Sequence, residues 1–303
     1  MTNNTYIGRF APSPTGPLHF GSLIAAICSY AQARHQKGKW LVRIEDIDQP
    51  RCSPSATKLI LDALDTYGMH WDDSVTYQSQ RSEYYQAALE QLNKNQLTYG
   101  CACTRKQLSE QSSPISTPSV YPGTCREGLK KGEIARSIRL RTHHQKVSFQ
   151  DRIQGNVSQD IYQDVGDFII KRADNIFAYQ LAVVVDDHEQ KITEVVRGSD
   201  MLDSTPRQIF LQQCLSYSTP DYIHIPLAIN ADGSKLSKQT HARAIPLNDP
   251  RPMLISALTF LCQHPPPELR ESNIESIWGW IIEHWSLKSI PTKLGIIYND
   301  KHE

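Results

Sequence analysis

The amino-acid sequence predicts an α/β protein with a parallel sheet, interrupted by an inserted α+β subdomain and followed by a short helical region. Strand, loop, helix and strand alternate at the N-terminus, and the alternation resumes near residue 165. A polar stretch that contains three cysteines lies between the two parts. Strands and helices that alternate along a chain are typical of a parallel sheet covered by helices.

The N-terminal elements follow from local sequence. The segment 6–10 has the pattern of a short strand, and the loop APSPTGPLHFG is too rich in proline and glycine for regular structure. Apolar residues at helical spacing predict a helix at 21–36. A second strand is expected at 39–44, before the acidic run EDID.

The remaining elements divide the chain further. The insert is expected to contain a helix at 80–99, a loop at 104–124, and strands at 136–141 and 145–149. The α/β pattern resumes with DFIIKR, a helix at 177–187, a strand at 192–197 and a helix at about 204–215. We therefore assign an α/β domain to 1–78 and 165–240, an insert to 79–164, and a helical remnant to 241–303.

Composition excludes several classes of protein. The 303 residues are 39% hydrophobic and 21% charged, as in ordinary globular proteins. Lys+Arg and Asp+Glu both number 32, so bulk positive charge does not drive binding to nucleic acid, although a local basic face remains compatible. No apolar run approaches the roughly 18 residues of a membrane span, and the N-terminus does not resemble a signal peptide. We expect a cytoplasmic protein without membrane contact.

Two segments carry residues suited to binding phosphate. His19 and Gly21 lie where the proline/glycine loop enters a helix, and a helix N-terminus favours anions. Lys235 and Lys238 flank a serine in the loop KLSK, where lysines can contact a polyphosphate as point charges. Taken singly, the first segment is compatible with a surface histidine in a loop, and the second with two solvated lysines.

Together the two segments resemble the signatures of class I aminoacyl-tRNA synthetases. RFAPSPTGPLHFGS resembles the HIGH signature in the form particular to the glutamyl/glutaminyl branch, and KLSKQ resembles the KMSKS loop. RIEDID, FAYQLAVVVDD, ITEVVRGSDMLDSTPRQ and HIPLAINADGSKLSK look like glutamyl-tRNA synthetase blocks in the same order, over about residues 6–240. The chain departs from the signatures at Ser22, Leu236 and Gln239, and keeps both lysines.

The resemblance implies a Rossmann-like catalytic domain and a role for each matching residue. His19 and Lys238 would offset charge on the phosphates of MgATP, with Gly21 and Lys235 also at the ATP site. The implied glutamate-binding residues are two carboxylate-facing arginines, an acid for the α-ammonium, a tyrosine hydroxyl and the backbone after the first strand: Arg9, Arg197, Glu45, Tyr179, Ala11 and Ser13. Asp186, Asp187 and Asp200 are expected to be structural.

The cysteines suggest a metal site within the insert. The chain has seven cysteines, and three of them, Cys101, Cys103 and Cys125, lie close together in the sequence. Three thiolates can hold Zn²⁺, which takes four ligands, although three unrelated reduced cysteines remain an alternative on spacing alone. The resemblance implies a structural Zn²⁺ with Tyr121 as the fourth ligand; His143 or His144 is the chemical alternative.

In the short length of its segment after Lys238, the chain resembles the glutamyl-Q tRNA(Asp) synthetase subfamily, whose members lack an anticodon-binding domain. Members of that subfamily attach glutamate to queuosine in the anticodon loop of tRNA(Asp). We therefore expect a ligase, and a monomer, that uses ATP, L-glutamate and queuosine-containing tRNA(Asp). The alternatives are a minimal glutamyl-tRNA synthetase that charges tRNA(Glu), an inactive tRNA-binding paralogue, and an unrelated nucleotidyltransferase.

Overall fold

Two sets of parallel strands form the centre of the protein in the computed structural model, which describes residues 5–111, 120–236 and 243–298. The first set has three parallel strands, in the order β1 (Ile7–Phe10), β2 (Lys39–Ile44) and β3 (Thr76–Tyr77). The second has three parallel strands and an antiparallel edge strand, in the order β9 (Glu194–Gly198), β10 (Asp221–Ile225), β6 (Lys146–Asp151) and β7 (Gly155–Asp160).

The two sets meet along β1 and β9. The Ile7 backbone N–H donates to Thr193 Oγ1 over 2.9 Å, and the Thr193 N–H donates to the Ile7 carbonyl over 2.9 Å. The carboxyl ends of β1, β2 and β9 therefore lie near one another, and the predicted parallel α/β class is confirmed. Strands 6–10, 39–44 and 192–197 were expected from sequence close to where they occur.

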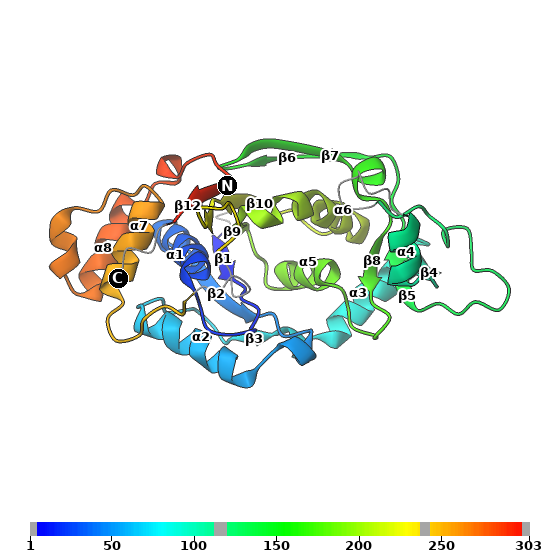
Figure 1. Ribbon diagram of the computed structural model, residues 1–303, viewed down its shortest axis with the longest axis horizontal. Helices are drawn as coiled ribbons and strands as arrows, with labels where there is room; N and C mark the ends of the chain where they lie inside the picture. The colour runs from blue at the N-terminus through cyan, green and yellow to red at the C-terminus, as the bar shows by residue number, and fades with distance from the viewer. Residues whose placement is uncertain (1–4, 112–119, 237–242, 299–303) are drawn as a thin grey trace.

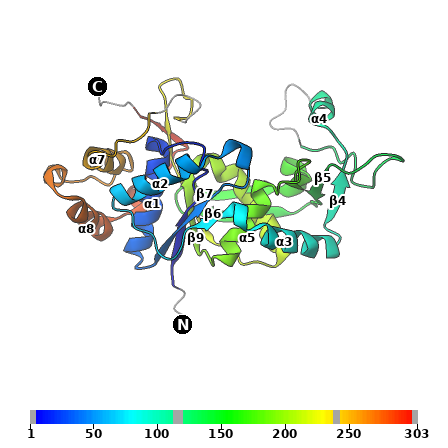
Figure 2. The same ribbon diagram turned by 90° about the horizontal axis from the view of Figure 1, so that it is seen from below.

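Helices cover the strands and extend the molecule at both ends (Figure 1). The helix α1 (Phe20–His35) packs against β1 and β9 and against the C-terminal helices. Those helices lie at one end of the long axis, and the sheet of the insert lies at the other, as Figure 2 also shows. Besides α3 (Ser82–Lys94) of the insert, the longer helices are α2 (Pro54–Thr66), α5 (Tyr179–Glu189), α6 (Thr205–Leu215), α7 (Arg251–Phe260) and α8 (Ile274–His284).

Two strands of the insert, β4 (Thr98–Cys101) and β5 (Ser137–Leu140), form an antiparallel sheet with β8 (Phe168–Lys171), in the order β4, β5, β8. Strand pairing joins the parts of the chain more closely than the sequence indicated. β8 pairs with β5 of the insert, whereas β6 pairs with β10 of the parallel sheet. The domain boundaries at 79, 165 and 241 remain predictions.

Two local expectations in the insert were wrong. The predicted helix at 80–99 ends early, as α3 (Ser82–Lys94), because Gln96 adopts φ 58° and the chain then enters β4. The predicted loop at 104–124 begins with the helix α4 (Arg105–Gln111). Thr104 caps this helix: its hydroxyl accepts from the Gln107 N–H over 3.3 Å. Residues 112–119 of that loop lie outside the described residues.

The C-terminal region is largely helical, as expected, but it also supplies a strand. β12 (Gly295–Ile297) pairs in parallel with β11 (Leu227–Ile229). Short helical turns complete the fold at Gln49–Arg51, Gln78–Gln80, Ile161–Val165, Ser199–Ser204, Pro267–Glu271 and Leu287–Ser289. Within the described ranges, no helix has both the length and the apolar character to cross a membrane.

The core joins the C-terminal helices to the N-terminal domain. Side chains of α1, β2, α2, α7 and α8 form one continuous apolar cluster. Buried tryptophans place polar bonds inside it: Trp278 Nε1 donates to the Tyr67 carbonyl over 2.8 Å, and Trp285 Nε1 donates to Gln32 Oε1 over 2.9 Å. The C-terminal region therefore supports α1, whose N-terminus lies at the phosphate-binding candidate.

The core contribution of α2 can be tested with two leucines on the same helix. Leu64 is fully buried and Leu59 is 42% exposed. We expect Leu64→Ala to lower the free energy of unfolding by about 2–5 kcal/mol, because it leaves a cavity, and Leu59→Ala to change it by no more than about 0.5 kcal/mol. Urea denaturation followed by circular dichroism measures both; equal effects would contradict this packing.

Candidate active site

The predicted glutamate-binding residues gather where the parallel strands end. Arg9 lies in β1, Arg197 lies in β9, and Glu45 directly follows β2. The Glu45 N–H donates to the Pro12 carbonyl over 3.0 Å, so the loop with Ala11 and Ser13 is tied to the end of β2. Ligands of open α/β sheets bind at this edge.

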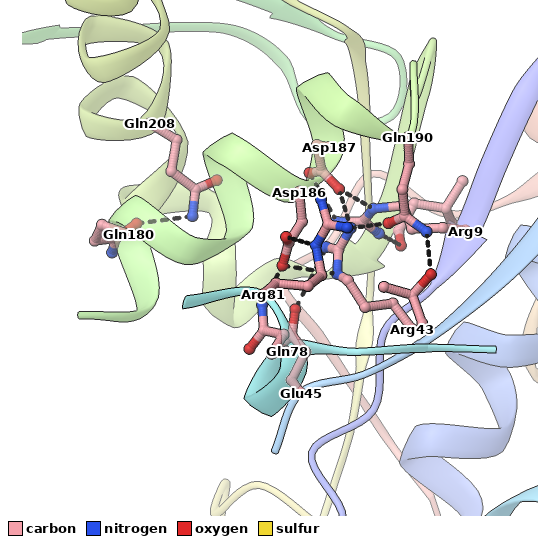
Figure 3. Close-up of polar contacts among 12 residues, drawn as sticks. Arg9, Arg43, Glu45, Gln78, Arg81, Gln180, Asp186, Asp187, Gln190 and Gln208 are labelled. Atoms are coloured by element: carbon pink, nitrogen blue, oxygen red, sulfur yellow. Dashed lines mark hydrogen bonds and ion pairs between the residues drawn. The ribbon is translucent and has the colours of Figure 1, made fainter. Parts of the chain in front are cut away.

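Asp187 of α5 links β1 and β2 by buried ion pairs with Arg9 and Arg43 (Figure 3). Its Oδ1 accepts from Arg9 Nε over 3.1 Å and from Arg43 Nη1 over 2.8 Å. Arg43, in β2, is completely buried. A buried guanidinium is tolerated only when carboxylates and hydrogen bonds surround it. Asp187 therefore fixes Arg9 relative to β2.

Asp186, the neighbour of Asp187, contacts a different set of side chains. It accepts from Arg81 Nε over 2.6 Å, from the Tyr85 hydroxyl over 2.9 Å and from Gln78 Nε2 over 2.8 Å. With Glu45 and Asp187 it makes three carboxylates, which face the guanidinium groups of Arg9, Arg43 and Arg81. The cluster thus places three carboxyl groups against three guanidinium groups.

The carboxylates of this cluster titrate differently. Burial alone would raise the pKa of Asp187, but Arg9 and Arg43 outweigh it and hold the pKa below the ordinary value. Burial dominates at Glu45 and raises its pKa to about 7. The Arg43 Nη2 lies 3.5 Å from the Glu45 carboxylate, whereas the Arg43 Nη1 makes the shorter bond, of 2.8 Å, to Asp187. Glu45 is thus the acid of the cluster least compensated by the protein's own cations.

Arg197 is a third buried arginine of the site, after Arg9 and Arg43. Its Nε donates to His224 Nε2 over 3.0 Å and its Nη2 donates to Thr205 Oγ1 over 2.8 Å. Its Nη1 is buried and has no hydrogen-bond partner within the described residues. Leaving such a donor unpaired is costly, so it marks a place for an anionic ligand. Burial raises the pKa of the nearby Tyr179 to about 12, which keeps its hydroxyl a donor.

The two signature-like segments lie against each other. His19 caps α1: its Nδ1 accepts from the Ser22 N–H over 3.4 Å, and Ser22 Oγ accepts from the His19 N–H over 2.8 Å. A Cβ at Gly21 would lie 3.3 Å from the Leu236 carbonyl oxygen. Glycine therefore permits the close approach of the KLSK loop to the start of the helix.

The lysines of the KLSK loop are described only in part. Lys235 Nζ lies 2.5 Å from Asp200 Oδ2, so Asp200 pairs with a lysine of the predicted ATP site. Lys238 lies in residues 237–242, outside the described part of the chain. Ala244, after this gap, forms a bridge with His19. Both described ends of the loop therefore lie beside the N-terminus of α1.

Three cysteines come together in the insert. The sulfurs of Cys101, Cys103 and Cys125 all lie within 4.8 Å of one another, and those of Cys103 and Cys125 are 3.6 Å apart. The Tyr121 hydroxyl lies 3.5 Å from the sulfurs of both Cys101 and Cys103. Sulfurs bound to one tetrahedral zinc at about 2.3 Å are separated by similar distances. The arrangement can hold a metal ion, with the Tyr121 oxygen beside it.

The surroundings of the cluster favour the thiolate form of Cys101, and both histidines that were the chemical alternative have other contacts. Burial opposes ionisation of Cys101, but hydrogen bonds from Tyr121 and Arg139 prevail and lower its pKa to about 7. His144 Nδ1 contacts Asp160 Oδ2 at 3.5 Å, and the His143 ring packs on Phe210. Neither histidine belongs to the metal-ligand group in the described residues.

Sequence reasoning did not single out several residues that shape the site. Arg43 and His224 both interrupt otherwise apolar strands, and a charged or polar side chain in a buried strand is itself a signal of a buried pair. The sequence around Arg43 and His224, however, does not indicate which acid pairs with either of them. The Asp187 and Asp151 partners come from elements far away in the chain.

Comparison with known sequences places the chain among close relatives. Residues 7–271 match the family described as tRNA synthetases class I (E and Q), catalytic domain. The chain is 52% identical over 291 residues to the Glutamyl-Q tRNA(Asp) synthetase of Dechloromonas aromatica, covering 95% of this chain and 97% of the relative. It is 49% identical to that of Escherichia coli K12, covering 96% and 92%.

Solved structures agree on the fold. The glutamate-tRNA synthetase of Elizabethkingia anophelis superposes with a TM-score of 0.81 at 23% identity, over 98% of this chain and 69% of that chain. A glutamate tRNA ligase of Elizabethkingia meningosepticum superposes with a TM-score of 0.82 at 23% identity, over 98% and 67%. The Rossmann-like fold of the class I enzymes, which the resemblance implied, is thereby confirmed.

The contribution of Asp187 to the free energy of unfolding can be measured directly. We expect Asp187→Asn to lower the free energy of unfolding at pH 7 by about 3–5 kcal/mol, because it leaves Arg9 and Arg43 without their shared carboxylate. The folded-state pKa of Asp187 is depressed, so its contribution is present above the unfolded pKa of about 3.9 and disappears as pH falls through the folded pKa. The difference from the wild type should therefore shrink below about pH 4 in urea titrations.

Asp73→Asn is the matched control. Asp73 pairs with Lys39 at the surface, where its side chain is 57% exposed, and should contribute no more than about 1 kcal/mol. A loss at Asp73 equal to that at Asp187 would refute the view that burial gives the Asp187 pair its importance.

Proposed function

We propose a function for this chain on the premise that it belongs to the class I tRNA synthetase family for glutamate and glutamine, whose catalytic domain it matches. It activates glutamate with ATP and transfers the glutamyl group to queuosine in the anticodon loop of tRNA(Asp). The observation that carries this proposal is high identity, over nearly the full length of both chains, to proteins named Glutamyl-Q tRNA(Asp) synthetase.

The charges at the strand ends suit free glutamate, which carries two carboxylates and an ammonium. Arg197 offers a buried Nη1 with no partner in the described part of the chain, and Arg9 lies in the neighbouring strand. Glu45 supplies the anion for the ammonium, and Tyr179 a hydroxyl donor. The raised pKa of Glu45 supports this role, since an arriving ammonium would supply the compensation that burial withholds. Ala11 and Ser13 line the pocket with backbone groups.

ATP is proposed to lie between the loop before α1 and the KLSK loop. The helix N-terminus favours its phosphates, and Gly21 admits a close approach of the chain. His19 and Lys235 lie at this junction, and Lys238 follows in the same loop. Mg²⁺ enters bound to ATP.

The reaction has two steps that need no enzyme nucleophile. The α-carboxylate of glutamate forms a bond to the α-phosphorus of ATP, and pyrophosphate leaves. A hydroxyl of the queuosine cyclopentene diol then attacks the glutamyl carbonyl, loses its proton, and displaces AMP. The protein positions the reactants, while His19 and Lys238 offset the charge that grows on the phosphates.

The cysteine cluster is proposed as a structural Zn²⁺ site. Cys101, Cys103 and Cys125 supply thiolates, and the hydroxyl of Tyr121 supplies the fourth ligand. Zinc would bind the end of β4 to the polar segment that follows it, which has little apolar surface of its own to bury. We further propose that the enzyme acts as a cytoplasmic monomer.

The acceptor is tested by transfer of radiolabelled glutamate to tRNA(Asp) with and without queuosine, beside tRNA(Glu). We expect label on the queuosine-containing tRNA(Asp) alone, and none when His19→Ala replaces the wild type. Label on tRNA(Glu) would favour a minimal glutamyl-tRNA synthetase. Absence of both transfer and glutamate-dependent ATP–pyrophosphate exchange would favour an inactive paralogue.

Metal content tests the cysteine cluster. We expect one zinc per chain in elemental analysis of the purified protein, and loss of zinc in Cys103→Ser, because three ligands bind far less tightly than four. Tyr121→Phe should weaken zinc retention during dialysis against a chelator. Cys52→Ser, at a cysteine outside the cluster, is the control and should keep its zinc; zinc-free wild type would exclude the site.

A further inference from the structure

A chain of buried polar side chains ends at Arg197. Arg197 Nε donates to His224 Nε2 over 3.0 Å, and His224 Nδ1 lies 2.6 Å from Asp151 Oδ2. His224 is fully buried, and Asp151 is 1% exposed. The three residues come from three neighbouring strands, β9, β10 and β6.

The contacts determine which nitrogen of His224 carries the proton. Asp151 can only accept, so Nδ1 must donate to it, and Nε2 is left as the acceptor that the Arg197 Nε–H requires. Burial and the charge of Arg197 lower the pKa of His224, although Asp151 opposes them. Neutral His224 with Nδ1–H is therefore the form that satisfies both Asp151 and Arg197. Its Nε2 also lies 3.0 Å from Thr205 Oγ1, whose hydroxyl can donate either to it or to the Met201 carbonyl.

Asp151 is itself held rigidly. Its Oδ1 accepts from the backbone N–H groups of Ile153 and Gln154, over 3.0 and 2.8 Å. Its carboxylate also accepts from the His224 backbone N–H over 3.1 Å. These bonds orient Oδ2 toward the imidazole. The backbone of the turn after β6 thus determines the position of Arg197 through two intervening side chains.

The neighbouring nitrogen on the same edge of the guanidinium, Nη2, is also occupied. Arg197 Nη2 donates to Thr205 Oγ1, whose own hydroxyl can donate to the Met201 carbonyl over 3.1 Å. Nε and Nη2 are thus both bound to the protein. Nη1 alone is buried without a partner among the residues described. A planar guanidinium held at two of its three nitrogens has a fixed orientation, so Nη1 can point in only one direction.

We propose that Asp151 and His224 are positioning residues, which hold the Nε edge of Arg197 so that Nη1 faces a carboxylate of the bound glutamate. The inference rests on the proposed function for the role of Arg197 as a glutamate ligand. A side chain orientated before the substrate binds loses less entropy on binding, and fixed donors discriminate a carboxylate from a carboxamide.

Two variants of His224 separate its contact with Asp151 from its contact with Arg197. Asparagine places an amide near the position of Nδ1, where it can donate to Asp151, but it cannot reach Arg197. Glutamine reaches the position of Nε2 with an oxygen that accepts from Arg197 Nε. We expect His224→Asn to raise the KM for glutamate about tenfold in ATP–pyrophosphate exchange, with the KM for ATP unchanged, and His224→Gln to restore part of the loss.

Asp151→Asn tests the other link. An amide N–H that faces Nδ1 requires Nδ1 to accept, so the imidazole proton would lie on Nε2. Two donors, Nε2–H and the Arg197 Nε–H, would then face each other, and the KM for glutamate should rise again. Nitrogen-15 NMR of the imidazole, assigned from the signal lost in His224→Gln, should show Nδ1–H in the wild type and Nε2–H in Asp151→Asn.

The outcomes distinguish the two proposals. A wild type without glutamate-dependent exchange would overturn the proposed function, and with it the assignment of glutamate to Arg197. An active wild type with an unchanged KM for glutamate in His224→Asn would overturn the positioning role alone. Equal increases in the KM for glutamate and for ATP, together with equal effects in His224→Gln, would indicate a general structural role and would also overturn it. Nε2–H in the wild type would refute the tautomer on which the chain of contacts depends.

Discussion

The shared carboxylate of Asp187 is the contact on which the rest of the site depends. Its bonds to Arg9 of β1 and Arg43 of β2 join two parallel strands to α5 inside the protein. Because a buried charge without its partner is far more costly than a surface one, this pair restricts how the strands and the helix can be placed. The carboxyl ends of β1 and β2, where Glu45 lies, are therefore fixed relative to each other.

Other buried charged side chains of the site are also held by groups of the protein. Arg197 is held by two neutral groups along the Nε/Nη2 edge of its guanidinium, and its Nη1 has no partner among the described residues. Arg9 is held by Asp187, and Glu45 is left with a raised pKa. The protein pairs its structural charges internally and leaves a small number incompletely compensated. Those few are the groups that a charged amino acid can satisfy.

Several features of the site could be predicted from sequence because they depend on neighbouring residues. His19 and Gly21 lie at a helix start that local pattern located within one residue, and Ser22, which departs from the family signature, forms the cap with His19. The predicted helix at 80–99 was wrong where a single left-handed residue, Gln96, ended it. Local propensity does not indicate such a termination when the residue is not glycine or asparagine.

The sequence by itself determined the alternation of strands and helices, the order of the signature segments, and the three cysteines with a tyrosine at a spacing that allows a common site. Only the tertiary structure decided which charges meet: Asp187 rather than another acid for Arg9, and Asp151 through His224 for Arg197. The reason is physical. Periodicity and turn chemistry act over a few residues, whereas an ion pair depends on distances set by packing between strands and helices far apart in the chain.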